Sequence, residues 1–215
     1  LMVDRAGLVG ADGDTHQGLL DVSWARAVPN LEMYSPADEA SLKRMMEYAA
    51  GREGPTLIRY PRGSLPVRGN LPSGGESLGA VRVCEGTDWA LLGHGAAVHI
   101  LLEARDRAGA LGLPEPAVID IRRLKPLDMA LIDEVLERYP LVAVAEENYL
   151  IGGVGEAVGA RIAEAGYPAR LRRFGVPDVC VPHATIPEQR ELYGLTAENI
   201  LEECRADLPI RPRTV

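Results

Sequence analysis

The sequence predicts an α/β fold in which a partial parallel-sheet unit is followed by a complete α/β unit, and three observations lead to it. The 215 residues are 47% hydrophobic but only 5% aromatic, so the core must be built from Ala, Val, Leu and Ile, which covered strands and packed helices use. Strand-like and helix-like apolar patterns alternate along the chain. Residues 64 to 80 interrupt this alternation with glycine, proline and serine, which predicts a boundary between two units.

The first unit is predicted as strand, loop, strand, helix, strand. Residues 1 to 4 read as a buried strand, and because no starting Met, signal-peptide pattern or cleavage site accompanies it, we expect the chain to be cut from a longer protein. Residues 5 to 18 have neither helical nor strand period, which is typical of a loop. Ser35 is a suitable N-cap for the helix, and Pro36 suits its first position. The strands predicted on either side of this helix are 31–34 and 56–60.

The second unit alternates more regularly, as the sequence of a doubly wound sheet does. Its predicted strands are 89–92, 117–121, 141–145 and 171–174. Its predicted helices are 96–110, a helix capped by Asp128 that runs to about 139, a helix that follows the turn at 152–155 and continues to 165, and a closing helix capped by Thr196.

The composition restricts the classes of partner and compartment. The chain carries 23 basic and 31 acidic side chains, for a net charge of -8, and it has no long basic run, so nucleic acid is not an expected partner. No apolar stretch is long enough to predict a membrane span. Three cysteines without a CxxC spacing predict neither a disulfide framework nor a metal site. They favour a reducing interior, so we expect a cytoplasmic location unless a targeting segment lies upstream.

The turn at Gly152 to Gly155 is one candidate binding segment. It lies between a predicted strand and a predicted helix, where a dinucleotide phosphate can approach a helix N-terminus. However, Val158 stands where the dinucleotide fingerprint needs Gly or Ala, and Glu146 and Glu147 would place negative charge near a pyrophosphate. The pattern therefore favours a tight structural turn, and no cofactor-binding residue is assigned to it.

The loop of residues 5 to 18 is the better candidate, because it follows a parallel strand, where open α/β sheets bind ligands. Arg5 supplies a guanidinium, His16 can exchange a proton near neutral pH, and Asp12 can orient that histidine or bind a substrate hydroxyl. Arg62, at the end of another strand, suits phosphate or carboxylate oxygens. The alternatives are a polar turn with a solvated histidine and a surface arginine in an ion pair, and the pattern alone leaves them open.

Motifs along nearly the whole chain together resemble one enzyme family. The loop reads DRAGLVGADGDTHQG over residues 4–18, and the later strand ends in IRYPRG over residues 58–63. The other matching segments are 29–30, 35–39, 125–128, 146–148 with 152–153, and 175–178 with 182–183. These motifs resemble the 1-deoxy-D-xylulose-5-phosphate synthases, which are thiamine-diphosphate enzymes of the transketolase superfamily.

The resemblance implies a domain organisation. Residues 1–64 would be the later part of a pyrimidine-binding domain, residues 65–80 a linker, and residues 81–215 a transketolase C-terminal-like domain. The family's diphosphate-binding domain, with its Mg²⁺ ligands, and the glutamate that activates thiamine diphosphate would all precede residue 1. We therefore expect the chain to be inactive by itself.

The resemblance also implies a reaction and residue roles. The family condenses pyruvate with glyceraldehyde 3-phosphate to 1-deoxy-D-xylulose 5-phosphate with loss of carbon dioxide, on the route to isoprenoid precursors and thiamine. Arg5 and Arg62 would contact the substrate, with Arg62 at the phosphate, while Asp12 and His16 would be the catalytic polar and proton-handling groups. The implied partners are the missing N-terminal part and a second copy in a homodimer. The alternatives are a subunit of another transketolase-like enzyme and a noncatalytic oligomerisation module.

Overall fold

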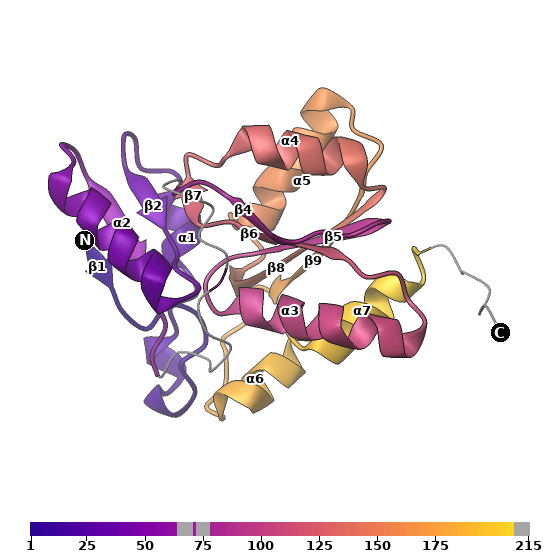
Figure 1. The fold of residues 1–215 in the computed structure, drawn as a ribbon. Helices are drawn as coiled ribbons and strands as arrows, with labels where there is room; N and C mark the ends of the chain where they lie inside the picture. Colours follow the sequence, from indigo (N-terminus) through magenta and orange to yellow (C-terminus); the bar gives the residue numbers. More distant parts are fainter. Residues whose placement is uncertain (64–70, 72–77, 209–215) are drawn as a thin grey trace.

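A computed structural model describes residues 1–63, 71 and 78–208 of the chain. Two twisted sheets dominate it, and helices pack around the larger one (Figure 1). This arrangement confirms the predicted α/β class. The predicted linker lies largely outside the described residues, and the proposed domain limits stay a prediction.

The first sheet has the strand order β1-β3-β2-β7, in which β1, β3 and β2 are parallel and β7 is antiparallel to β2. Its strands span Met2–Val3 (β1), Thr56–Arg59 (β3), Glu32–Tyr34 (β2) and Arg123–Lys125 (β7). Two helices and two short 3-10 turns accompany it: α1 at Asp21–Ala25, α2 at Glu39–Gly51, η1 at Gly10–Asp12 and η2 at Asp14–His16. The edge strand β7 comes from beyond the predicted linker, so both parts of the chain build this sheet.

The second sheet has the order β4-β6-β5-β8-β9, and all of its strands are parallel except the edge strand β4. Its strands span Val81–Cys84 (β4), Ala117–Asp120 (β6), Trp89–Gly93 (β5), Leu141–Tyr149 (β8) and Arg170–Val176 (β9). Successive side chains of a strand point to opposite faces. Thus Leu91 of β5 lies in one core cluster, while Ala90 and Leu92 lie in the other.

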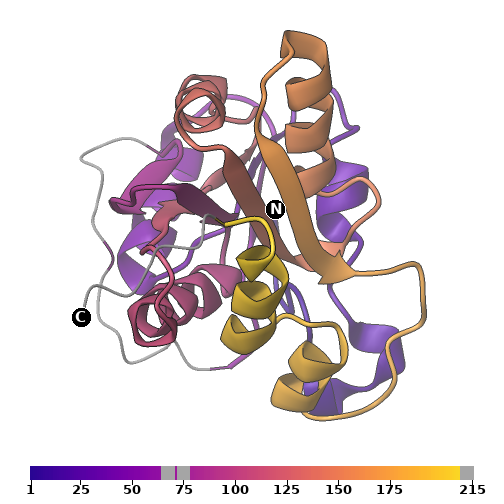
Figure 2. The same cartoon turned by 90° about the vertical axis from the view of Figure 1, so that its right-hand side faces the viewer.

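Helices cover both faces of this second sheet (Figures 1 and 2). One face carries α3 at Ala97–Ala108, continued by the short turn η3 at Gly109–Leu111, and α7 at Ala197–Arg205. The opposite face carries α4 at Met129–Arg138 and α5 at Val154–Ala165. The remaining helix, α6 at Ile186–Leu192, lies against the turn η1 of the first unit. The predicted doubly wound arrangement is therefore present.

Three local predictions are wrong or incomplete. The N-terminal strand forms but is not buried, because Leu1 is 75% exposed at the outer edge of its sheet. The helix after β2 is capped by Asp38 instead of Ser35: the Asp38 side chain accepts the Ser41 N–H in a capping box, whereas the Ser35 N–H donates to Arg122 beside the strand. The sequence patterns also missed α1, β4, β7 and α6, which are elements of three to seven residues and too short to give a clear period.

Candidate active site

The loop between β1 and α1 is closed on itself at its base. Gly7 and Gly18 exchange two backbone hydrogen bonds of 2.9 Å, and the Val9 N–H donates to the Gln17 side chain. Arg5 adopts a φ of +58°, a backbone conformation that non-glycine residues rarely hold and that clusters at functional sites. The loop is thus a structured element that presents its tip beyond the carboxyl end of β1.

Asp12 joins Arg5 and Arg62 into one cluster. Its Oδ2 accepts a hydrogen bond of 2.9 Å from Arg5 Nε, and its Oδ1 lies 2.8 Å from Arg62 Nη1. Arg62 follows β3, the neighbour of β1, so the two guanidiniums meet because parallel strands end at the same edge of the sheet. Hydrogen bonding to Asp12 raises the pKa of Arg5 above its usual value.

The cluster is open to solvent on the arginine side. Arg5 and Arg62 are roughly half-exposed, whereas the Asp12 carboxylate between them is largely buried. Asp4 lies 3.0 Å from Arg5 and brings the formal charge of the four side chains to zero. A guanidinium carries five N–H donors, so a single carboxylate oxygen does not saturate it. The arrangement holds two guanidiniums in place and leaves faces of each available to an anionic ligand.

His16 lies on the exposed turn η2, and its Nδ1 is 3.1 Å from Thr15 Oγ1. One of the two roles predicted for Asp12 was to orient His16. In this structure both Asp12 oxygens contact arginines instead. The structure therefore brings three of the four predicted site residues into contact and leaves the fourth in the same loop.

A cavity of about 410 Å³ opens next to Arg62. It lies between the end of β3, the start of α3 and helix α6, and its polar lining includes Asp38, Tyr60, His99 and Arg190. Open volume therefore adjoins the arginine cluster on the side of the second sheet.

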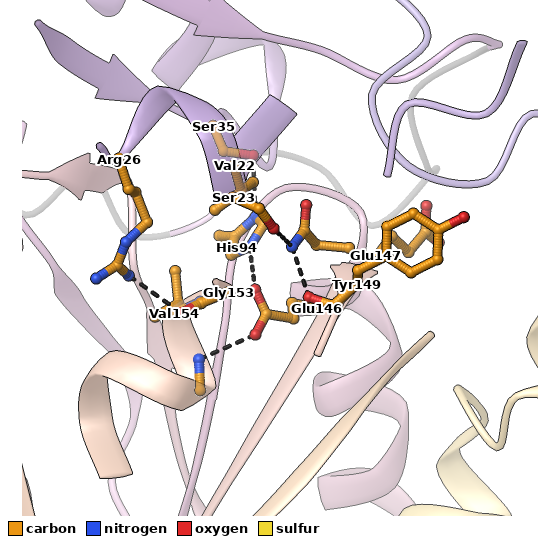
Figure 3. A network of polar contacts seen from close by, with 12 residues as sticks. Val22, Ser23, Arg26, Ser35, His94, Glu146, Glu147, Tyr149, Gly153 and Val154 are labelled. Carbon is orange, nitrogen blue, oxygen red and sulfur yellow. Dashed lines mark hydrogen bonds and ion pairs between the residues drawn. The ribbon is translucent and has the colours of Figure 1, made fainter. Parts of the chain in front are cut away.

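A buried polar network lies behind the loop, where the two sheets meet (Figure 3). His94, just after β5, lies 3.6 Å from Glu146 of β8 and 3.2 Å from Ser35 of the first unit. Arg59 of β3 donates to Asp21 at 2.7 Å. Burial lowers the pKa of His94, and the contact with His94 and two backbone N–H groups holds the pKa of Glu146 below its usual range although burial opposes this. The network couples both units without facing solvent.

The same Glu146 explains the glycine turn before α5. Its two carboxylate oxygens accept the N–H groups of Val154 and Gly155, each at 2.9 Å. A Cβ at Gly153 would lie 2.4 Å from Glu146 Oε1, which requires glycine at that position. The helix N-terminus is thus filled by the protein's own carboxylate, in agreement with a structural turn instead of a nucleotide site.

The sequence patterns missed the side chains that hold the loop from the second unit. Glu147 of β8 and Gln189 of α6 accept backbone N–H groups of Leu8 and Gly10, and Arg190 pairs with Glu147. No sequence pattern assigns Glu147 a role in holding the loop, and none predicts α6. The sequence does contain one indication of this contact, which is the pair of carboxylates at the carboxyl end of a buried strand.

Other classes of site are less well supported in the described part of the chain. No group of three or more His, Cys, Asp or Glu side chains within residues 1–63, 71 and 78–208 is placed to hold a metal ion. The three cysteines are free thiols. None of the helices in those residues is long and apolar enough to cross a bilayer.

Comparison with family models defines the class of protein. Residues 1–68 match the transketolase pyrimidine binding domain, and residues 79–200 match the transketolase C-terminal domain. The chain therefore belongs to the transketolase family.

Within that class, several curated relatives that it matches are named 1-deoxy-D-xylulose-5-phosphate synthase. The protein from Crocosphaera subtropica is 40% identical over 207 residues, covering 94% of this chain and 32% of the relative. The one from a Synechococcus species is 40% identical over 218 residues, covering 97% of this chain and 34% of the relative. The chain thus spans about a third of the length of these relatives.

Two solved structures agree with this fold. One is described as a split gene transketolase, inactive beta4 tetramer; it is 29% identical with a TM-score of 0.79, and the match covers 98% of this chain and 67% of that one. The other is transketolase from Campylobacter jejuni, which at 19% identity and a TM-score of 0.73 supports the fold alone, over 96% of this chain and 30% of that one.

Proposed function

We propose that this chain is the pyrimidine-binding and C-terminal part of a thiamine-diphosphate-dependent 1-deoxy-D-xylulose-5-phosphate synthase. The complete enzyme would condense pyruvate with glyceraldehyde 3-phosphate, release carbon dioxide and supply isoprenoid precursors. The observation that carries the proposal is the cluster of Arg5, Asp12 and Arg62, which offers two oriented guanidiniums to a phosphorylated substrate. The 40% identity to synthases supports it.

Thiamine diphosphate supplies the carbanion-stabilising chemistry of such an enzyme when it is bound. Within residues 1–63, 71 and 78–208, no group of three or more His, Cys, Asp or Glu side chains is placed to hold the Mg²⁺ ion. We propose that the cofactor's metal and diphosphate are held by the remainder of the enzyme, and we assign to this chain the recognition of substrate and a proton transfer by His16.

Each residue of the cluster has a proposed task. Arg62 binds the phosphate of the aldehyde, because it is the more exposed guanidinium and adjoins the open cavity. Arg5 binds the same anion from the other side of Asp12, which keeps the two guanidiniums at a defined spacing. His16, on the exposed turn, moves a proton at a hydroxyl or carbonyl oxygen of the substrate.

The test is steady-state kinetics of the complete enzyme with Arg62→Ala. Loss of charge-assisted hydrogen bonds of about 1.5–3 kcal/mol predicts a decrease of roughly 10- to 150-fold in kcat/KM for glyceraldehyde 3-phosphate, with the KM for pyruvate nearly unchanged. Arg161→Ala, which removes an arginine of another Arg–Asp pair, is the matched control. Equal effects on both substrates would contradict the phosphate role of Arg62, and unchanged turnover of His16→Ala would remove His16 from the catalytic residues.

A subunit of a different transketolase-like enzyme is the second candidate function. The observation that favours it is the similarity to a structure described as a split gene transketolase, which this chain matches over 98% of its length. Assays of the chain, alone and together with the domains encoded upstream, separate the two candidates. Product formation from pyruvate and glyceraldehyde 3-phosphate supports the synthase, transfer from a ketose phosphate supports the alternative, and activity with neither supports a noncatalytic oligomerisation module.

We also propose that two copies of the chain associate through an exposed apolar surface at α1. Leu20 and Trp24 lie one helical turn apart, Trp24 is 50% exposed, and exposed Ile151 is held next to them by a hydrogen bond from Ser23. Light scattering should give the mass of a dimer for the wild type and a smaller mass for Trp24→Glu. A monomeric wild type would contradict this proposal.

The free thiols agree with a cytoplasmic location, which cell fractionation tests.

A further inference from the structure

The loop that carries Arg5 and Asp12 is attached at its centre to the second unit. Glu147 Oε2 accepts the Leu8 N–H at 3.2 Å, and Gln189 Oε1 accepts the Gly10 N–H at 3.1 Å. Both side chains are buried, and Gln189 is itself held by a hydrogen bond to the Pro182 carbonyl. The two backbone groups that lie between Arg5 and Asp12 in sequence are therefore bound by side chains from elements far along the chain.

Glu147 is in turn held from two sides. Arg190 Nε donates to its Oε1 at 2.7 Å, and Arg190 Nη2 lies 2.6 Å from the same oxygen. Arg59 Nη2 donates to the Glu147 carbonyl at 3.1 Å and to the Gly18 carbonyl, at the base of the loop, at 3.0 Å. A buried carboxylate with charge-assisted partners of this kind has little freedom to move.

The loop backbone also lies directly on these elements. A Cβ at Gly7 would come within 2.2 Å of Glu147 Oε2, and one at Gly10 would come within 3.0 Å of the Ile186 backbone nitrogen. Such close approach leaves no room for the loop to move toward β8 or α6. Because Arg5 and Asp12 lie two residues outside Gly7 and Gly10, their positions follow those of the attached segment.

We infer that Glu147, supported by Arg190, is a positioning residue that sets the spacing of the Arg5, Asp12 and Arg62 cluster. The inference deepens the proposed function and rests on it for its kinetic consequence. Glu147 lies outside both the cluster and the lining of the adjoining cavity, so its effect on substrate recognition passes through the Leu8 N–H and the loop backbone. Arg190 also lines that cavity, so Glu147 is the residue whose substitution isolates the positioning role. A weakened attachment releases Arg5 and Asp12 from Arg62, and it therefore reduces affinity for the phosphorylated substrate more than affinity for pyruvate.

The first measurement is amide hydrogen exchange of the full chain, which needs no catalysis. Arg190→Gln should accelerate exchange of residues 5–18 by about tenfold, equal to about 1.4 kcal/mol. The matched control is Arg161→Gln, because Arg161 pairs with Asp133 at 2.7 Å and its side chain is 34% exposed, against 30% for Arg190. The control should leave exchange of the loop unchanged, and Glu147→Gln should reproduce the effect of Arg190→Gln.

The second measurement is a comparison of KM values in the complete enzyme. Glu147→Gln, at a residue outside the cavity lining, should raise the KM for glyceraldehyde 3-phosphate about tenfold and the KM for pyruvate less than about twofold. A merely structural role would lower thermal stability and change both KM values together, which would overturn the inference. Wild-type exchange and wild-type KM values in both Arg190→Gln and Glu147→Gln would also overturn it.

The two proposals fail in different ways. Accelerated exchange of the loop in Arg190→Gln, with no synthase activity in the assembled wild type, contradicts the proposed function and supports the attachment of the loop. Normal synthase activity with a loop that does not respond to either substitution contradicts the positioning role and leaves the proposed function supported.

Discussion

Replacing Gly7 by alanine tests how closely the loop is held against β8. Gly7 has a φ of +87°, and a Cβ at that position would lie 2.2 Å from Oε2 and 2.8 Å from the Cβ of Glu147. Rotation of the Glu147 side chain cannot relieve the second contact, because its Cβ is fixed by the strand backbone. The loop must move away, and the 3.2 Å hydrogen bond from the Leu8 N–H to Glu147 is lost.

Gly13→Ala is the matched control, because it separates the effect of a positive φ on the free energy of unfolding from the effect of the contact with Glu147. Gly13 lies in the same loop with a φ of +95°, but a Cβ there would meet nothing within 4 Å. Each substitution forces a side chain onto a positive φ, which costs about 1–3 kcal/mol. Only Gly7→Ala also breaks a hydrogen bond to a buried carboxylate, which adds about 1.5–3 kcal/mol. We therefore expect Gly7→Ala to lower the free energy of unfolding by about 1.5–3 kcal/mol more than Gly13→Ala does.

Urea-induced unfolding of the full chain, followed by the fluorescence of the buried Trp89, measures this difference. The comparison requires equal m-values, so that the change in midpoint reports stability. If the two variants agree within about 0.5 kcal/mol, the contact with Glu147 does not constrain the loop and the reasoning is wrong.

Two further predictions concern the buried polar side chains of His94 and Asp38. Burial lowers the pKa of His94, so the folded protein binds fewer protons than the unfolded chain, and stability falls as the pH drops below the unfolded value of about 6.5. While His94 stays neutral in the folded protein, the free energy of unfolding should fall by about 1 kcal/mol between pH 6.5 and pH 5.5. Urea unfolding at several pH values measures this decrease, which should be absent in His94→Gln. The same dependence of stability on pH in the variant and the wild type would contradict the prediction. Asp38→Ala removes the cap of α2 and should lower the free energy of unfolding by about 1–2 kcal/mol, measured in the same way, whereas a neutral result would show that the hydrogen bond to Ser41 is replaced by solvent.

The arginine cluster was accessible to sequence reasoning because its geometry follows from topology. Arg5 and Arg62 each follow a strand, and strands β1 and β3 are parallel neighbours, so their ends must meet at one edge of the sheet. Helices α3, α4 and α5 of the second unit were predicted nearly to their ends because their local patterns are clear. Asp128 and Thr196 cap α4 and α7 in the structure, as the local pattern indicates.

The attachment of the loop was not accessible, because its partners are far apart in sequence. Glu147 and Leu8 are separated by 139 residues, and Gln189 and Gly10 by 179, so no local period connects them. The misplaced cap of α2 has a different origin. Ser35 fits the local cap pattern, but its tertiary contacts with Arg122 and His94 keep it extended, and the cap passes to Asp38.

Strand β7 also governs the order in which this protein can complete its structure during synthesis. Its pairing joins Met33 to Lys125, so β2 leaves the ribosome roughly 90 residues before the strand that covers its outer edge. At about 5–20 residues per second, that edge stays open for roughly 5–20 s in every nascent chain. An open strand edge is a template for pairing with other chains. Yield in the cell should therefore depend on chaperones that shield the first unit, and fragments that end before residue 125 should aggregate.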